Sequence, residues 1–549
     1  MKKLGVALAI AVASVGAARA ADLPTTKGPP PAAPPVNCFA SIWSWLDSTP
    51  ADCPFSWGPF TAYATLDGGL TYESNGAPYN ARWNNGVDSF IQKQSFGPKW
   101  LWSPNNLSQS VAGIKMSQPL PSLGSSSFLS GWSLIGTFEW GFNPFYGFPA
   151  AAQQSQVNQN GRALLLQAAG ADSSRSNQID NSQGFVGLSN KTYGTLTVGR
   201  VNTLSLDAIN SYDPMGGSYA FSPLGFSGSF AGFGDTEAAR ANTAVKYRLD
   251  LPSNLFGLPG GANFRVGGLW QFGGYDQLNG TNGMYQGQVG GDFNLFGGSP
   301  FAGVLSMDAI GSWAKDAVNL STFTGACATL TKGPFSGQTG CTLGLPMFYA
   351  DTDLKATLSN NTGFLFTAKY KVQALTVYGG YSWLKQANPS DDFPNGFETI
   401  GGFNVPGTIP AISPAIAKLF PTQWVITNNF NIPRIAPYWW LGAKYAITPQ
   451  LDVTGAFYYL DQTNFSTTAC VGTLFTTVAP TGQKISVGRI NSGNCAGSED
   501  FYSALIDYRP FKRLDVYAGL MVSNVYGGLA SGFPATQDIS PTAGIRVRF

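Results

Sequence analysis

The sequence predicts an all-β protein, a transmembrane antiparallel β-barrel of about sixteen strands with one loop folded inward. Three observations predict this fold class: apolar and polar side chains alternate along most of the chain, short connections alternate with long ones, and aromatic residues gather near strand ends. Of the 549 residues, 13% are aromatic, 67 are glycine and only 11% are charged. A globular domain carries about a quarter charged residues. The composition therefore favours many strands and turns over helices.

The first twenty residues predict export. A basic start, "MKK", is followed by a short apolar run and the cleavage pattern "ARA", so residues 1–20 are expected to be a signal peptide. The Pro-rich segment 21–58 follows and is expected on the periplasmic side. Cleavage removes three of the 32 basic residues and none of the 30 acidic ones, so the mature chain is almost neutral and no nucleic-acid partner is indicated. After the signal peptide no apolar run approaches about 18 residues, which excludes a transmembrane helix.

The six cysteines form three local pairs along the sequence. An exported protein meets an oxidising compartment, and pairing between sequence neighbours is the simplest of the many possible connectivities. Metal binding is the competing interpretation, which is weakened by the absence of a CxxC motif and of any histidine. The predicted disulfides join Cys38 to Cys53, Cys327 to Cys341, and Cys470 to Cys495.

Segments with period two begin at about residue 59 and continue to the end of the chain. In "MYQGQVGGDFNLF", Tyr285 and Val289 alternate with Gln286 and Gln288. About sixteen such segments occur, each about ten residues long, which spans a bilayer when the strands are tilted. Tight connections such as "QALT", "TPQLD" and "PFKRLD" alternate with long polar ones at 317–360, 386–436 and 462–499. Short turns at one end and long loops at the other are typical of outer-membrane barrels, so residues 59–549 are predicted to form one.

The two faces of these strands favour a membrane barrel over a soluble sandwich. The apolar face is rich in aromatic residues near strand ends, with Trp439, Trp440 and Tyr458 as examples, and aromatic girdles lie at membrane interfaces. The opposite face is polar on strand after strand, as a water-filled lumen requires. In the final "TAGIRVRF" the apolar face ends on Phe549. Basic residues that this parity places in the lumen are Lys115, Lys246, Arg248, Arg265, Lys369, Lys371, Arg546 and Arg548.

Residues 201–239 interrupt the strand pattern and contain no basic residue. Their acids are Asp207, Asp213, Asp235 and Glu237. Arg200 and Arg240 flank the stretch on the two strands that it joins. If it folds into the lumen, its acids face bases on the wall, and the resulting transverse field orders water and disfavours apolar solutes. The alternative is an ordinary surface loop. Arg200 shares parity with apolar residues, so a bulge near Gly199 is needed to turn it inward.

The same region carries a family resemblance. "GFVGLSNKTYGTLTVGR" resembles the fourth and fifth strands of general Gram-negative porins, "LDAINSYDPMGG" resembles their pore-constricting third loop, and "RANTAVKY" resembles the start of the sixth strand. The N-terminal "NCFASIWSW" and "ADCPFSWGPFTAYATLDGG" are similar to porins of alphaproteobacteria. The resemblance covers nearly the whole mature chain.

The resemblance implies roles for individual residues. Asp207 and Asp213 would be acids at the constriction, with Arg200 and Arg240 in the basic cluster that faces them. It also implies a homotrimer, and a terminal Phe549 that the assembly machinery reads. One departure matters: the family's loop often carries Pro-Glu-Phe near its tip, whereas "DPMGG" has no glutamate there. Selectivity that depends on that glutamate is not carried over.

The predicted function is an outer-membrane porin, a passive water-filled channel for small hydrophilic solutes and ions, surrounded by outer-membrane lipid and lipopolysaccharide. Bases outnumber acids at the expected constriction, which predicts a mild anion preference. Neither enzyme activity nor a cofactor is expected, because the chain has no histidine, no G-x-S-x-G and no phosphate-cradling loop. A substrate-specific channel of up to eighteen strands and a secreted all-β carbohydrate-binding protein stay as alternatives. A TonB-dependent transporter is disfavoured, since no plug domain of about 100–150 residues precedes the first strand.

Overall fold

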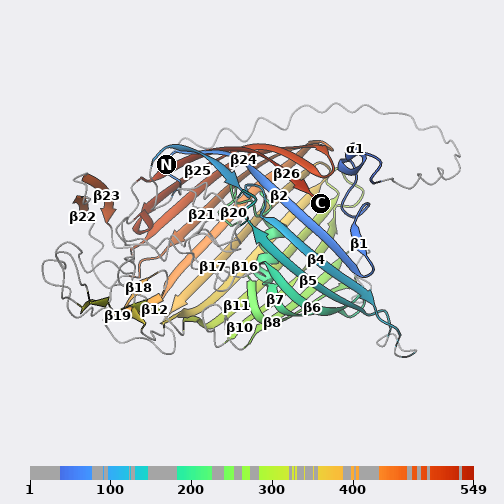
Figure 1. Ribbon diagram of the computed structural model, residues 1–549, viewed down its shortest axis with the longest axis horizontal. Helices are drawn as coiled ribbons and strands as arrows, with labels where there is room; N and C mark the ends of the chain where they lie inside the picture. Colours follow the sequence, from blue (N-terminus) through green and yellow to red (C-terminus); the bar gives the residue numbers. More distant parts are fainter. Residues whose placement is uncertain are drawn as a thin grey trace.

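The computed structural model is a closed β-barrel (Figure 1). It describes residues 38–76, 91, 97–122, 124, 130–145, 147, 182–224, 240–252, 262–272, 283–320, 324–326, 328–329, 339–340, 350–351, 356–387, 397–400, 403–406, 432–465, 473–478, 484–490, 495–530 and 535–549. Within these residues, no helix has the length and apolar character that a membrane-crossing helix needs.

Sixteen antiparallel strands make the wall, as predicted. They are β2 (Phe60–Glu73), β3 (Lys99–Pro104) together with β4 (Ser110–Pro119), β5 (Ser133–Phe142), β6 (Gln183–Asn190), β7 (Gly194–Asn202), β8 (Arg240–Pro252), β9 (Asn263–Gln271), β10 (Gly283–Leu295), β11 (Gly303–Leu320), β16 (Ala356–Val372), β17 (Leu375–Ala387), β20 (Arg434–Thr448), β21 (Leu451–Gln462), β24 (Gly497–Phe511), β25 (Leu514–Gly527) and β26 (Gln537–Arg548). Strands β3 and β4 pair with successive parts of β2 and count as one interrupted wall strand. Pairing of Thr65–Thr71 in β2 with Thr542–Arg548 in β26 closes the barrel.

The other elements lie outside this wall count. They are α1 (Ile42–Leu46), β1 (Phe55–Trp57), α2 (Leu204–Tyr212), the 3-10 helix η4 (Gly528–Ala530), and four two-stranded ribbons made by β12 (Thr324–Ala326) with β15 (Ala350–Asp351), β13 (Ala328–Thr329) with β14 (Thr339–Gly340), β18 (Phe397–Ile400) with β19 (Phe403–Pro406), and β22 (Thr473–Val478) with β23 (Lys484–Ile490). The ribbons belong to the long connections at one end of the barrel, whereas α1 and β1 lie at the short-turn end (Figure 1).

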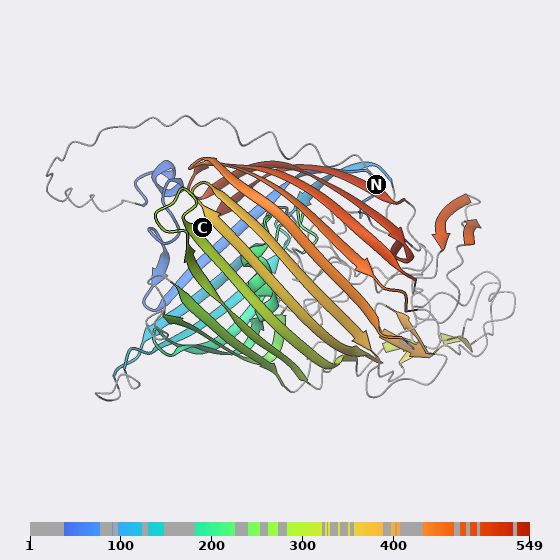
Figure 2. The ribbon, with the colours of Figure 1, turned by 180° about the vertical axis from the view of Figure 1, so that it is seen from behind.

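The wall is uneven in height. Strands β4, β5, β6 and β7 have 10, 10, 8 and 9 residues, but β11 has 18 and β16 has 17. The predicted strand length of about ten residues is therefore confirmed for β4 to β7 and wrong for β11 and β16. The difference is visible in Figure 2, where the β11–β17 side is longer than the side behind it. Period two gives the face of each residue but does not mark where pairing stops, since the same alternation runs through the whole of a paired hairpin.

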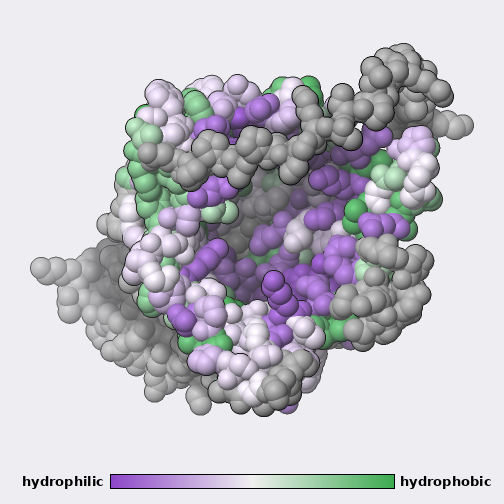
Figure 3. Space-filling model, turned by 90° about the vertical axis from the view of Figure 1, so that its right-hand side faces the viewer, coloured by the Kyte–Doolittle hydropathy of each residue, from purple (hydrophilic) through white to green (hydrophobic). Residues whose placement is uncertain are grey.

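The faces are inverted relative to a soluble protein. Val186, Leu441 and Ile545 are exposed on the outer surface, while polar residues are buried inside. Thr71, for example, is fully buried, with its Oγ1 2.8 Å from Ser103 Oγ. Figure 3 shows the hollow end of the barrel with hydrophilic residues lining the hollow. This is the arrangement of a barrel with lipid outside and water inside.

A disulfide loop lies at the rim of the short-turn end. Cys38 and Cys53 are bonded, as predicted, with their Cα atoms 5.8 Å apart. Cys495 is also disulfide-bonded, whereas its predicted partner Cys470 lies outside the described residues. The predicted pair of Cys327 and Cys341 lies outside them as well.

Candidate functional site

One segment of the connection between β7 and β8 contacts the inside of the wall, and we call residues 203–224 the inner segment. It begins with α2, whose N-cap is Thr203, with the side chain accepting a 3.1 Å bond from Leu206 N–H. A threonine with extended backbone is a favourable N-cap, and the acidic Asp207 in the first turn interacts well with the positive end of the helix dipole. Leu204 and Ala208 are buried, while Asn210 and Ser211 are exposed. One side of the helix is therefore buried and the other is exposed.

Strand β10 holds the start of the helix. Gln286 Oε1 accepts a 2.8 Å bond from Leu204 N–H, and its Nε2 donates to Ser205 Oγ at 3.1 Å. The first N–H groups of a helix have no partner within it, so a wall side chain that accepts from one of them fixes the helix end.

Asp207 faces the basic residues of β8. Its Oδ2 lies 2.5 Å from Lys246 Nζ and 4.0 Å from Arg248 Nη1. Both lysine and aspartate are partly exposed, so the pair lies at the edge of the open lumen. Asp207 therefore lies beside Lys246 and Arg248, as predicted. The sequence analysis expected these charges to face each other across the open lumen, whereas Asp207 and Lys246 form an ion pair.

Strand β16 holds the end of the helix. Lys369 Nζ donates to Ser211 O at 3.0 Å and lies 5.1 Å from the centre of the Tyr212 ring. A cation at a helix C-terminus is favoured by the helix dipole, and the ring face adds a cation–π contact. Arg265 reaches the same tyrosine, with Nη1 3.5 Å from its hydroxyl.

Asp213 differs from the expected pore acid. It is 2% exposed, and its carboxylate accepts bonds from Gly217 N–H at 2.8 Å and from Tyr458 Oη–H at 2.6 Å. Burial raises the pKa of this carboxyl above its usual value, although the hydrogen bond from Tyr458 acts in the opposite direction. Asp213 therefore ties a turn to β21 and presents no charge to the lumen.

The end of α2 and the residues after it contact further strands of the wall. Trp440 Nε1 on β20 donates to Tyr212 O at 3.1 Å, and Phe221 makes an edge-to-face contact with Tyr517 on β25 at 6.3 Å. Ala220 N–H donates to Asn106 O at 2.9 Å, between β3 and β4. The inner segment therefore contacts wall strands β10, β20 and β25 and the connection between β3 and β4.

Two aromatic residues correct the sequence interpretation. Trp440 and Tyr458 were expected in the outer aromatic girdle, yet both are buried inside the barrel and bond to the inner segment. Trp439, one position away, is exposed on the outside. Strand parity separates these neighbours, and parity is the signal that could have found the inward-facing pair.

Lys115 and Arg200 lie on the short strands β4 and β7, and Arg240 begins the next strand, β8. The register shifts between Gly199 and Val201, and Gly199 has φ +132°, so the bulge predicted beside Arg200 is present. Arg200 is buried. Arg240 Nη2 lies 3.4 Å from Ser182 Oγ, and that hydroxyl donates to Glu139.

Lys115 belongs to the same group of residues. Its Nζ lies 4.5 Å from the Tyr63 ring centre, and the Tyr63 hydroxyl donates to Glu139 at 2.8 Å. Glu139 was not among the predicted site residues, although its lumen parity on β5 was available from the sequence.

The other predicted lumen bases meet acids of the wall. Arg265 bonds Asp250, Asp292 and Asp308 at 3.0, 3.1 and 2.9 Å. Arg546 and Arg548 both bond Asp515, each at 2.9 Å. Lys371 is exposed on β16. Much of the basic lining is thus neutralised within the wall by carboxylates of lumen parity on neighbouring strands.

The geometry defines a class of protein, a membrane β-barrel whose polar interior holds a folded segment. Among the described residues, no group of three cysteine, aspartate or glutamate side chains is placed to hold a metal ion. The lining supplies charge and hydrogen bonds along a passage, which is the chemistry of a channel.

Comparison with known proteins also identifies the chain as a channel-forming β-barrel. Residues 7–405 match the model of the family described as Gram-negative porin, and the chain belongs to that family. It is therefore an outer-membrane channel protein and not an enzyme. None of the curated proteins matches the chain.

Solved structures with a similar fold are distant in sequence. The anion-selective porin from Comamonas acidovorans has 12% identity and a TM-score of 0.46, covering 89% of this chain and 99% of that one. OmpT of Vibrio cholerae has 13% identity and a TM-score of 0.44, covering 90% and 100%. Salmonella typhi OmpF has 13% identity and a TM-score of 0.42, covering 89% and 97%.

Proposed function

We propose that this porin admits small hydrophilic solutes and ions by passive diffusion, and that the inner segment sets its narrowest point. The observation that carries the proposal is the exposed edge of α2. Asp207, Asn210 and Ser211 follow one another at helical spacing on that edge. Lys246, Arg248 and Lys369 approach it from the wall. A solute that passes α2 meets polar and charged groups on both sides.

The charges at this point support a mild anion preference. Lys246, Arg248 and Lys369 bring three positive charges to the exposed edge of α2, while Asp207 brings one negative charge and Asp213 is buried against Tyr458. Arg265 adds a fourth positive charge at Tyr212, and the wall acids that it bonds, Asp250, Asp292 and Asp308, oppose it, so the preference stays mild. Low-dielectric walls strengthen the effect of each uncompensated charge. The preference should weaken as salt rises, because the Debye length at 0.1 M is about 10 Å, comparable to a pore radius.

Solute uptake by vesicles tests the passive mechanism. The purified chain in liposomes should pass uncharged sugars at rates that fall steadily with solute size and do not saturate with concentration. Saturation with one sugar, and exclusion of others of equal size, would instead support the substrate-specific channel.

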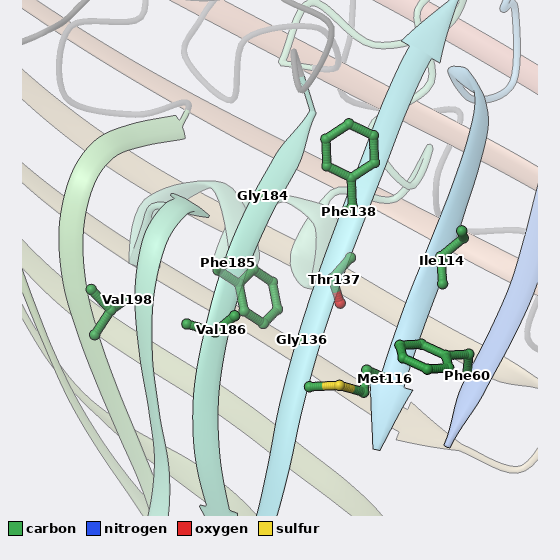
Figure 4. Close-up of a pocket in the computed structure, with 10 residues that line it drawn as sticks. All are labelled: Phe60, Ile114, Met116, Gly136, Thr137, Phe138, Gly184, Phe185, Val186 and Val198. Atoms are coloured by element: carbon green, nitrogen blue, oxygen red, sulfur yellow. The ribbon is translucent and has the colours of Figure 1, made fainter. Parts of the chain in front are cut away.

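We also propose a homotrimer in which the low side of the wall faces the partners, as the family resemblance implies. Figure 4 shows a groove on the outer surface of this side, with a volume of about 530 Å³. Phe60, Ile114, Phe138 and Val186 line its rim, and Gly136 and Gly184 leave its floor low. Such a surface suits the interlocking of apolar side chains between subunits, while the tall side suits lipid and lipopolysaccharide.

A charge in the groove tests the trimer. Val186→Arg should convert trimers to monomers in mild detergent, measured by light scattering, because the exposed Val186 lies on the rim of the groove. Val377→Arg is the matched control on the outer face of β17, where Val377 is also exposed. Retention of the trimer by Val186→Arg would exclude this surface.

A further inference from the structure

The disulfide loop and β1, residues 38–58, form an N-terminal cap that is not needed to close the wall. We propose that this cap is a membrane-interface anchor, which inserts Phe39, Ile42 and Trp43 into the headgroup region of the periplasmic leaflet. The proposal concerns lipid binding by the cap and stands apart from the solute pathway.

The cap is held firmly to the barrel. Arg513, in the tight turn between β24 and β25, is fully buried. Its Nη2 donates to Thr49 O at 3.0 Å and to Cys53 O at 2.8 Å, and its backbone N–H donates to Leu46 O at 3.1 Å. Its guanidinium also lies 4.8 Å from the Trp45 ring centre. These contacts satisfy a buried cation and fix the orientation of α1.

The register of β1 places the cap on the outer side of the wall. Trp57 pairs with Phe60, and Phe55 pairs with Ala62, along the part of β2 that lies beyond its pairing with β26. Directly opposed residues of two paired strands share a face of the sheet. Phe60 shares the outward parity of the exposed Leu66 and Leu70. The cap aromatics of β1 therefore continue the lipid-facing surface.

The helix α1 lies on the same side. Trp45 packs against the terminal Phe549 with ring centres 5.2 Å apart. Phe549 has the outward parity of the exposed Ile545, and its N–H donates to Ala64 O at 2.8 Å. Trp43 lies 5.7 Å from Phe511, which pairs with Leu514. Because α1 packs on outward-facing rings at the rim, its free side points toward lipid and not toward the pore mouth.

The free side of the cap is strongly apolar. Phe39 is 67% exposed, Ile42 60% and Trp43 63%, whereas Trp45 is only 9% exposed. Tryptophan and phenylalanine with this exposure, next to a lipid-facing band, match the amphipathic residues of membrane interfaces. The cap has two acids, Asp47 and Asp52, and no basic residue. Apolar burial and not attraction to anionic lipid should therefore drive the contact.

Fluorescence quenching by brominated lipid tests the anchor. The full chain is placed in nanodiscs of phosphatidylcholine brominated either near the headgroup or deep in the acyl chain. Trp43→Phe should remove a quenched component, and that component should be quenched about twofold more by shallow than by deep bromines. Trp45→Phe, two residues along the same helix but buried, is the matched control and should leave the shallow quenching unchanged.

The outcomes separate lipid from other occupants. The Trp43 component should be insensitive to anionic lipid and to salt. Absence of this component in nanodiscs would overturn the proposal, as would its appearance only when the chain is monomeric, which would assign the surface to a second copy. If either variant lost the heat-modifiable migration of the folded barrel, Ile42→Asp with Trp43 retained would be measured instead, and unchanged shallow quenching in that variant would also overturn the anchor.

Discussion

The inner segment meets the wall at two places that differ in their chemistry. On the exposed edge of α2 the contacts are charged and partly exposed, as between Lys246 and Asp207 or between Lys369 and Ser211 O. In residues 213–224 the contacts are buried, as between Asp213 and Tyr458 or between Phe221 and Tyr517. A partly exposed ion pair adds little stability, while losing one partner of a buried hydrogen bond to a charged group costs more. We infer that the buried contacts hold the segment and that the charged contacts act on passing ions.

The largest effect is expected when the buried contacts are removed at Asp213. Asp213→Ala removes the acceptor for Tyr458 and for Gly217 N–H, which should cost about 2 to 3 kcal/mol of local stability. Single-channel recordings should then show several conductance levels in place of one. Ser211→Ala is the control, because its hydroxyl bonds only to the Asp207 carbonyl within the helix. A single unchanged level for Asp213→Ala would contradict a holding role for the buried contacts.

A smaller effect should appear in the pH dependence of stability. Burial raises the pKa of Asp213, so the folded protein binds this proton more tightly than the unfolded chain does. The free energy of unfolding should therefore fall as the pH rises from about 4 toward the raised pKa and become level above it, at about 1.4 kcal/mol for each unit of the shift. Asp213→Asn should flatten this slope in urea unfolding from vesicles. Equal slopes for both proteins would show that Asp213 is not the group responsible.

The role of the charged contacts beside α2 in ion selectivity is tested by Lys369→Gln. Glutamine keeps a donor for Ser211 O but removes the charge, so the reversal potential in a salt gradient should move toward cations without a change in conductance levels. Lys512→Gln, in the exposed turn between β24 and β25, removes the same charge away from α2. An equal shift in both variants would mean that total charge, and not the charge beside α2, sets selectivity.

The smallest effect is expected at Arg240. This residue begins β8 and lies near Ser182, whose hydroxyl donates to Glu139. Arg240→Ala should still move the reversal potential toward cations, but by less than Lys369→Gln, since an acid is close by. A larger shift than that of Lys369→Gln would place the selective charge beside β5 and not beside α2.

Parity alone predicted most of the fold. Arg546 and Ile545 illustrate why: adjacent residues on a strand point to opposite sides, so one bonds Asp515 in the lumen and the other is exposed outside. The same rule predicted the bulge at Gly199, because Arg200 broke it. The full length of β11 and β16 was not predictable in this way, since the same alternation runs through the whole of a paired hairpin.

The candidate site was less accessible to sequence reasoning. Asp207 and Lys246 could be proposed together because they lie at the start of one connection and on the strand after it. The partner of Asp213 is Tyr458, 245 residues away. This contact depends on which wall strand the inner segment reaches in the folded barrel. A single sequence gives no information on contacts between residues so far apart in the chain. The same reason hid the contact of Trp45 with Phe549.

Modification of a thiol on α2 tests the central claim most directly. Ser211 lies on the exposed edge of the helix, so Ser211→Cys supplies an accessible target, and the unsubstituted chain is treated in the same way to measure any reaction at other thiols. A trimethylammonium methanethiosulfonate added during bilayer recording should reduce the conductance of Ser211→Cys by about half or more and move its reversal potential toward anions. Ser299→Cys, in the short turn between β10 and β11, has the same serine-to-carbonyl bond in the parent chain and should show neither change. Full labelling of Ser211→Cys with unchanged conductance would contradict the claim that the inner segment sets the narrowest point of the channel.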